Sequence, residues 1–158
     1  MSFNAAKIEI RPLDGSDFDA ILGIAEILDQ APHWSRQHYE EILRADAPRP
    51  RVALVACGPR TAEIAGFAIA ALVPPQAELE SIAVAANAQR RGIGRRLMAA
   101  LTADLRRHGI AELQLEVRAS NSPALGFYAS LGFRETARRP GYYAHPKEDA
   151  VLMALELG

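Results

Sequence analysis

The segment Gln89-Arg90-Arg91-Gly92-Ile93-Gly94-Arg95, called here the 89–95 loop, combines arginines and glycines directly before an apolar run of helical period. Glycine lets a backbone approach a ligand closely, and the unpaired N–H groups and dipole of a helix start favour an anion. We therefore expect this loop to bind a phosphate group. It lacks the third glycine of a dinucleotide fingerprint and the Gly-Lys-Ser/Thr ending of a Walker loop. The alternative is a glycine-containing turn with solvated arginines.

Glu116 and Tyr128 lie downstream and carry groups that can move protons. Residues 111–117 alternate strictly between apolar and polar types, which predicts a strand with Glu116 on the face opposite its leucines. Tyr128 lies in the next helical segment. An acid at the polar edge of a central strand and a tyrosine one helix later can both reach a shared cleft. Taken alone, Glu116 is more simply a solvated strand residue and Tyr128 a core aromatic.

Hydrophobic periodicity predicts the elements that must position these groups. Strands are expected over residues 7–13, 51–57, 63–72, 78–85, 111–117, 133–138 and 149–157. Helices are expected from about residue 16 to 30, 35 to 43, 92 to 108 and 122 to 132, with candidate N-caps at Asp14 or Ser16, Ser35, and Asn121 or Ser122. A strand, a long helix and another strand in succession imply that the two strands pair in parallel. The fold class is therefore mixed α/β.

Composition limits the possible functions. The chain has 158 residues, 49% of them hydrophobic, and a formal net charge of -1, so we expect one domain over residues 1–158 and no nucleic-acid partner. No leader pattern is present and no apolar stretch approaches the roughly 20 residues of a membrane span, so we expect a cytoplasmic protein without a membrane partner. Cys57 is the only cysteine, and no cluster has metal-ligand spacing, so we expect neither a disulfide nor a metal. The oligomeric state is not readable from the sequence.

Further blocks of sequence surround the 89–95 loop. They are Ser81-Ile82-Ala83-Val84, Leu115-Glu116-Val117-Arg118-Ala119-Ser120-Asn121, Phe127-Tyr128-Ala129-Ser130-Leu131-Gly132-Phe133, and the closing segments 142–143 and 148–155. With the loop, these blocks resemble the GNAT acetyltransferase superfamily, and in particular the RimI-type ribosomal-protein alanine N-acetyltransferases. The similarity is dense from Leu79 to Leu157 and thin before it, where Trp34-Ser35 is its main sign.

The resemblance implies a fold, a cofactor and residue roles. It implies a GNAT-like α/β fold, with a mixed central sheet of about six to seven strands flanked by about four helices, and acetyl-CoA as the acetyl donor. By resemblance, Ile82, Ala83 and Val84 would present backbone to the thioester and pantetheine, Gln89, Arg90, Arg91, Gly92, Ile93, Gly94 and Arg95 would hold the pyrophosphate, and Asn121 would bond to the cofactor. Glu116 would be the general base, acting directly or through water. Tyr128 would be the general acid, or would only hydrogen-bond the leaving sulfur.

The acceptor is less closely defined by the sequence. Trp34, Tyr142 and Tyr143 are expected in loops bordering an acceptor groove, although ordinary loop packing is an equal alternative. An α-amine with a pKa near 8 is neutral about one time in ten at pH 7, whereas a lysine is neutral only about once in 2,500. We therefore expect a protein N-terminal α-amine, as in a ribosomal protein. The alternatives are a small-molecule amine or lysine side chain, and a non-catalytic acyl-CoA-binding module.

Overall fold

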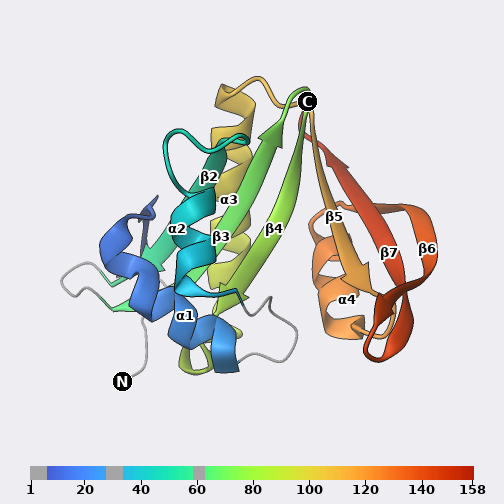
Figure 1. Ribbon diagram of the computed structural model, residues 1–158, viewed down its shortest axis with the longest axis horizontal. Helices are drawn as coiled ribbons and strands as arrows, with labels where there is room; N and C mark the ends of the chain where they lie inside the picture. The colour runs from blue at the N-terminus through green and yellow to red at the C-terminus, as the bar shows by residue number, and fades with distance from the viewer. Residues whose placement is uncertain (1–6, 28–33, 59–62) are drawn as a thin grey trace.

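A computed structural model describes residues 7–27, 34–58 and 63–158. Figure 1 shows a twisted sheet with α1 and α2 in front of it and α3 behind it. The strands are β1 (Glu9–Pro12), β2 (Arg51–Cys57), β3 (Ile64–Val73), β4 (Gln76–Val84), β5 (Glu112–Arg118), β6 (Arg134–Ala144) and β7 (Lys147–Glu156). The helices are α1 (Phe18–Ile27), α2 (Arg36–Ile42), α3 (Ile93–Arg107) and α4 (Ser122–Ser130), with short 3-10 turns at Gly15–Asp17 and Ala86–Ala88. None of the helices in these ranges is long and apolar enough to cross a membrane.

The seven strands form one sheet in the order β1-β2-β3-β4-β5-β7-β6. Neighbouring strands are antiparallel except β4 and β5, which are parallel and are connected through α3. The parallel pairing predicted from the strand, helix, strand succession is confirmed. So is the prediction of a mixed sheet of six to seven strands with four helices.

The sheet opens between its two parallel strands. Pairing joins β4 to β5 only from Gln76 opposite Glu112 to Glu78 opposite Gln114, although both strands continue well beyond these residues. Figure 1 shows the two strands starting together near the C-terminus and then diverging. A β-bulge at Glu80, where β4 pairs with β3, accompanies this divergence. The opening leaves backbone groups of both strands free of a strand partner.

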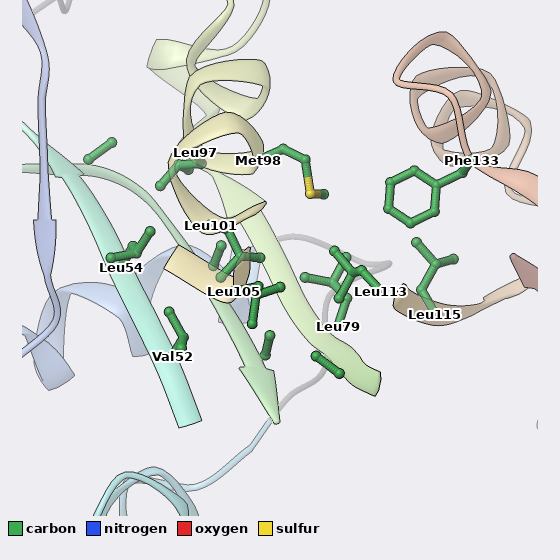
Figure 2. Close-up of a cluster of buried hydrophobic side chains, with 14 of the residues drawn as sticks. Val52, Leu54, Leu79, Leu97, Met98, Leu101, Leu105, Leu113, Leu115 and Phe133 are labelled. Atoms are coloured by element: carbon green, nitrogen blue, oxygen red, sulfur yellow. The ribbon is translucent and has the colours of Figure 1, made fainter. Parts of the chain in front are cut away.

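Two hydrophobic clusters hold the sheet between its helices. Leu97, Leu101 and Leu105 of α3 are fully buried in the larger cluster, which also takes side chains from β2, β4, β5 and β7 (Figure 2). Each fully buried leucine contributes about 1.5–3 kcal/mol to the hydrophobic stabilisation. Tyr39 and Phe67 belong to the second cluster, between the sheet and α1 and α2. These contacts anchor α3, and the 89–95 loop leads directly into that helix.

The helix starts follow the predicted caps. The Asp14 carboxylate accepts the Ser16 N–H ahead of α1, and the Ser35 hydroxyl accepts the His38 N–H in α2. Asn121 caps α4 in the same way. The predicted end of the first helix near Gln30 lies outside the described residues, within which α1 spans Phe18–Ile27.

Several strand boundaries differ from the prediction, most clearly at the β3–β4 turn and in β6. The β3–β4 turn is tighter than expected, because β3 runs to Val73 and β4 starts at Gln76. The expectation that Tyr142 and Tyr143 lie in a loop is wrong, because β6 continues past residue 138 to Ala144. The extra residues form a bulge, in which Gly141 has a left-handed φ of 61° and donates its N–H to Asp149 Oδ1 at 2.9 Å. Proline in this segment is tolerated because β6 is an edge strand.

Candidate active site

A cleft of about 960 Å³, called here the main cleft, occupies the opening between β4 and β5. The residues predicted from the sequence that line it are Ile82, Ala83, Val84, Gln89, Arg90, Gly92, Ile93, Gly94, Arg95, Glu116, Asn121, Tyr128 and Tyr143. Arg91, Trp34 and Tyr142 are not among its lining residues. Positions far apart in the sequence therefore meet at one place, the end of the sheet where its central strands separate.

The 89–95 loop has the geometry of an anion site. Arg90 and Gly92 adopt left-handed φ angles of 63° and 77°, and Gly92 is the N-cap of α3 without any side-chain cap. The first N–H groups of α3 thus have no side-chain acceptor, and the helix dipole adds positive potential there. Gln89 Nε2 donates to the Val84 carbonyl at 3.1 Å, which ties the loop to the end of β4.

Position 94 lies at a close contact between α3 and α4. A Cβ on Gly94 would lie 3.3 Å from the ring of Phe127 in α4. Arg95 strengthens the same contact, since its Nη2 donates to Ser130 Oγ at 2.7 Å. Arg96 points elsewhere and donates to the Ile8 carbonyl. The loop arginines therefore have different surroundings, which their spacing in the sequence did not reveal.

Asn121 both caps α4 and lines the main cleft. Its side-chain oxygen accepts the Ala124 N–H at 3.2 Å and so starts α4, while the residue lines the main cleft. The helix that carries Tyr128 is thus fixed by a residue of the cleft wall.

Glu116 and Tyr128 reach the opening from opposite faces of the sheet. Leu115 and Val117 belong to the cluster beneath α3, so Glu116 between them projects to the other face of β5. Tyr128 packs from α4 against the same cluster as the leucine and valine. Both residues line the main cleft. A group held between β4 and β5 would therefore have a carboxylate on one side and a phenol on the other.

The Tyr128 phenol is held in apolar surroundings. Its ring lies 5.5 Å from the rings of both Phe127 and Phe133. Burial raises the pKa of Tyr128 to about 12. Its hydroxyl has no hydrogen-bond partner within residues 7–27, 34–58 and 63–158. The phenol is consequently a neutral donor, without a competing acceptor in this part of the chain, throughout the physiological pH range.

Glu116 is bordered by charged and aromatic side chains of β6. Arg139 Nη1 lies 3.6 Å from Glu116 Oε1. The charge of Glu116 raises the pKa of the Tyr142 phenol, while burial first and the Glu116 charge second raise that of Tyr143. The Arg118 guanidinium stacks 4.2 Å from the centre of the Tyr143 ring. The β6 bulge therefore brings Tyr142 to the carboxylate, although Tyr142 does not line the main cleft.

A second, smaller hollow of about 230 Å³ meets the main cleft at Leu115 and Glu116. Its other lining residues come from the loop before β2 and from β3, β4, β5, β6 and β7. We call it the second hollow. Glu116 is thus accessible from two sides, one of them separate from the 89–95 loop.

Sequence reasoning missed several cleft residues. Glu80 lines the main cleft and accepts two hydrogen bonds from Arg51, at 2.7 and 3.1 Å. Nothing in the local pattern marked Glu80, because the bulge interrupts the alternation of β4. Arg118 was detectable, since it follows Glu116 by two residues and so shares its face. Phe127 and Arg139 carried no chemical signal in the sequence.

Trp34 has a packing environment. Its ring meets His38 and Tyr39 edge-on, with centroid distances of 4.8 and 5.4 Å, and it packs against the second cluster. Contact between Trp34 and an acceptor stays a prediction.

Comparison with known proteins decides the family. Residues 21–133 match the model of the acetyltransferase (GNAT) family. The chain belongs to this family. The predicted family and GNAT-like fold are therefore confirmed.

Specific relatives share one name. A [ribosomal protein bS18]-alanine N-acetyltransferase from Escherichia coli (strain K12) is 45% identical over 97 residues, which are 60% of this chain and 66% of that protein. The protein of the same name from Salmonella typhimurium is 47% identical over 96 residues, 60% of this chain and 65% of the relative. The matched segment thus spans just under two thirds of these relatives. The crystal structure of the ribosomal-protein-S18-alanine N-acetyltransferase from Escherichia coli has a TM-score of 0.81 at 34% identity, covering 96% of this chain and 94% of that one. The predicted likeness to RimI-type enzymes is confirmed.

Proposed function

We propose that this chain is an acetyl-CoA-dependent N-acetyltransferase whose acceptor is a protein N-terminal α-amine, that of a ribosomal protein by analogy with its relatives. The observation that carries the proposal is the placement of Glu116 and Tyr128 on opposite faces of β5, where the sheet opens. That arrangement offers a proton acceptor to an incoming amine and a proton donor to a departing group. The family supplies the reaction type.

The main cleft fits acetyl-CoA, which carries the acetyl group as a thioester and an anionic pyrophosphate. The uncapped start of α3 and the left-handed residues before it suit the pyrophosphate. A side chain at position 94 would crowd Phe127 and contact Val84, both of which line the main cleft. In this proposal the 89–95 loop, residues 82–84 and Asn121 hold the cofactor.

The chain's own residues move the protons. The amine approaches from the Glu116 side, its nitrogen bonds to the carbonyl carbon as the carbon–sulfur bond breaks, and Glu116 takes the released proton directly or through water. The Val84 N–H is the proposed donor to the oxygen that gains negative charge. The pKa of Tyr128, about 12, is far above the value near 8.5 of a thiol, so its phenol donates a hydrogen bond to the sulfur rather than surrendering its proton.

The side of the cleft that holds the amine has several aromatic groups. Tyr143 lines the main cleft, and Tyr142 lies against Glu116 from β6. In this proposal they border the acceptor N-terminus, with Trp34 near the start of α2. An α-amine suits this site because it is neutral about one time in ten at pH 7, far more often than a lysine side chain.

A peptide panel tests the acceptor. Synthetic hexapeptides with a free alanine N-terminus, the same peptides with a blocked N-terminus, a lysine-containing blocked peptide and spermidine are assayed by CoA release. Release only with the free N-termini supports the proposal. Release with the lysine peptide or spermidine alone would show that the acceptor is a lysine side chain or a small-molecule amine instead. Tight acetyl-CoA binding without release of CoA would indicate a non-catalytic acyl-CoA-binding module.

Variants test the catalytic role. Glu116→Gln is expected to lower kcat at least tenfold while leaving the affinity for acetyl-CoA within about twofold. The matched control is Glu135→Gln, on the exposed edge strand β6, where Glu135 pairs only with Arg138 among the described residues. Unchanged turnover of Glu116→Gln across pH would remove this carboxylate from the mechanism.

A further inference from the structure

Carboxylates around the active site are each matched by a different arginine. The pairs are Glu78 with Arg49 at 3.8 Å, Glu80 with Arg51 at 2.7 Å, Glu116 with Arg139 at 3.6 Å, and Glu148 with Arg118 at 3.4 Å. Every pair has at least one member in the wall of the main cleft or of the second hollow. The reaction centre is therefore close to electrical neutrality, although it is rich in charge.

Arg139 differs from the buried members of this set. Arg51 binds Glu80 with two nitrogens and has an 11% exposed side chain, which fits a structural brace. The side chain of Arg139 is 54% exposed, and Glu116 is its only ion-pair partner in the described ranges. Its guanidinium also lies 5.5 Å from the centre of the Tyr142 ring. Arg139 therefore adds little to packing and acts mainly through its charge.

That charge has a consequence for an amine bound beside Glu116. An unpaired carboxylate stabilises an ammonium next to it and so raises the pKa of the bound amine. A bound amine with a raised pKa is protonated at pH 7, and an ammonium has no lone pair for attack. A guanidinium on the same carboxylate repels the ammonium and offsets this effect. With the two cations about 5 Å apart in a partly hydrated site, the offset is about one pH unit.

We propose that Arg139 is a positioning residue that balances the charge of Glu116, so that the bound α-ammonium gives up its proton near its ordinary pKa. The inference rests on the proposed function, because it takes Glu116 as the proton acceptor. The ammonium loses one proton to solvent before attack, and the second proton passes to Glu116 as the nitrogen–carbon bond forms.

The other charged and titratable groups that face this site within the described residues do not form an ion pair with Glu116. They are Glu78 and Glu80 of β4, Arg118 of β5, Tyr142 and Tyr143 of β6, Glu148 of β7, Tyr128 of α4, and Arg49 and Arg51 at the start of β2. Each of these carboxylates has its own arginine, and the phenols are neutral below pH 10 because their pKa values are raised. Among these described residues, Glu116 depends on Arg139 alone for its counter-charge.

Arg139→Gln tests the proposal through the pH dependence of kcat, which reports the enzyme-bound amine. With a hexapeptide that starts with alanine, the midpoint of the kcat profile is expected to rise by about one pH unit. At pH 7, kcat and KM should both fall about tenfold, whereas kcat at pH 10 should equal that of the unaltered protein. Arg139→Lys keeps the charge and should restore the original profile. The control Arg138→Gln removes an exposed arginine of the same strand that pairs with Glu135.

Three outcomes separate the possibilities. The midpoint shift with rescue by lysine supports the proposal. A kcat loss that is equal at every pH, or an unchanged profile, overturns it and leaves Arg139 a structural residue. If Glu116→Gln itself leaves kcat unchanged, the proposed function fails at Glu116, a result that is independent of the Arg139 variants.

Discussion

Tyr128→Phe is the sharpest test of the chemistry derived from the structure. Transfer of a full proton from a phenol with a pKa of about 12 to a thiolate whose conjugate acid is near 8.5 is uphill by about 5 kcal/mol. A hydrogen bond to a charged sulfur is worth about 1.5–3 kcal/mol without any transfer. Removing the hydroxyl should therefore lower the rate of acyl transfer about 10- to 150-fold.

The assay is a single turnover with enzyme in excess over acetyl-CoA, followed by the release of CoA thiol from pH 6 to 10.5. The unaltered protein should show no loss of activity near pH 10, because the phenol stays protonated until about pH 12. The free energy of unfolding depends on the same phenol. Because the pKa of Tyr128 is raised in the folded protein, it contributes stability that is present below pH 10 and is lost as the pH rises toward 12. The phenylalanine variant should lack this loss.

Tyr39→Phe is the matched control. The Tyr39 hydroxyl is buried and has no hydrogen-bond partner among the described residues, burial also raises its pKa, and its ring packs in the second cluster away from the cleft. Both variants should keep the free energy of unfolding within about 1 kcal/mol, since neither removes a hydrogen bond. Only Tyr128→Phe should slow the reaction. Equal single-turnover rates in all three proteins would refute the role of Tyr128, and an activity loss centred at pH 10 would refute its raised pKa.

Three further substitutions test the packing and ion pairing of the sheet and helices that position the site. Arg11→Gln leaves the buried Asp17 carboxylate without its two 2.8 Å hydrogen bonds, so the free energy of unfolding in urea should fall by about 1.5–3 kcal/mol. Because Arg11 holds the pKa of Asp17 below its usual value, that stability is present above about pH 4 and is lost as the pH falls. The free energy of unfolding of the variant should therefore decrease less steeply at acid pH than that of the unaltered protein. Gly66→Ala would place a Cβ 2.7 Å from the Ala83 carbonyl oxygen. The free energy of unfolding of this variant should fall by about 1–3 kcal/mol, measured as a lower melting temperature. Gly94→Ala should raise the KM for acetyl-CoA several-fold with little change in melting temperature; an unchanged KM would count against the placement of the cofactor.

The local structure was largely predictable, because its causes are local. Side-chain spacing every helical turn predicts α3, and strict alternation predicts β5 with Glu116 opposite its leucines. Side chains that cap a helix act within three residues, so Asp14, Ser35 and Asn121 were also readable. The boundaries of β6 were not, because the bulge at Gly141 depends on a hydrogen bond to Asp149 in another strand.

The sequence by itself determined the family, and it predicted the proposed anion loop and the proposed proton-carrying residues, since each is recorded in residue types at short spacing. Only the tertiary structure decided how they meet. The opening between β4 and β5, the approach of Tyr128 and Glu116 from opposite faces, and the pairing of Glu116 with Arg139 all join segments separated along the chain. Such contacts are set by the packing of whole elements, and neither periodicity nor spacing within one element contains that information.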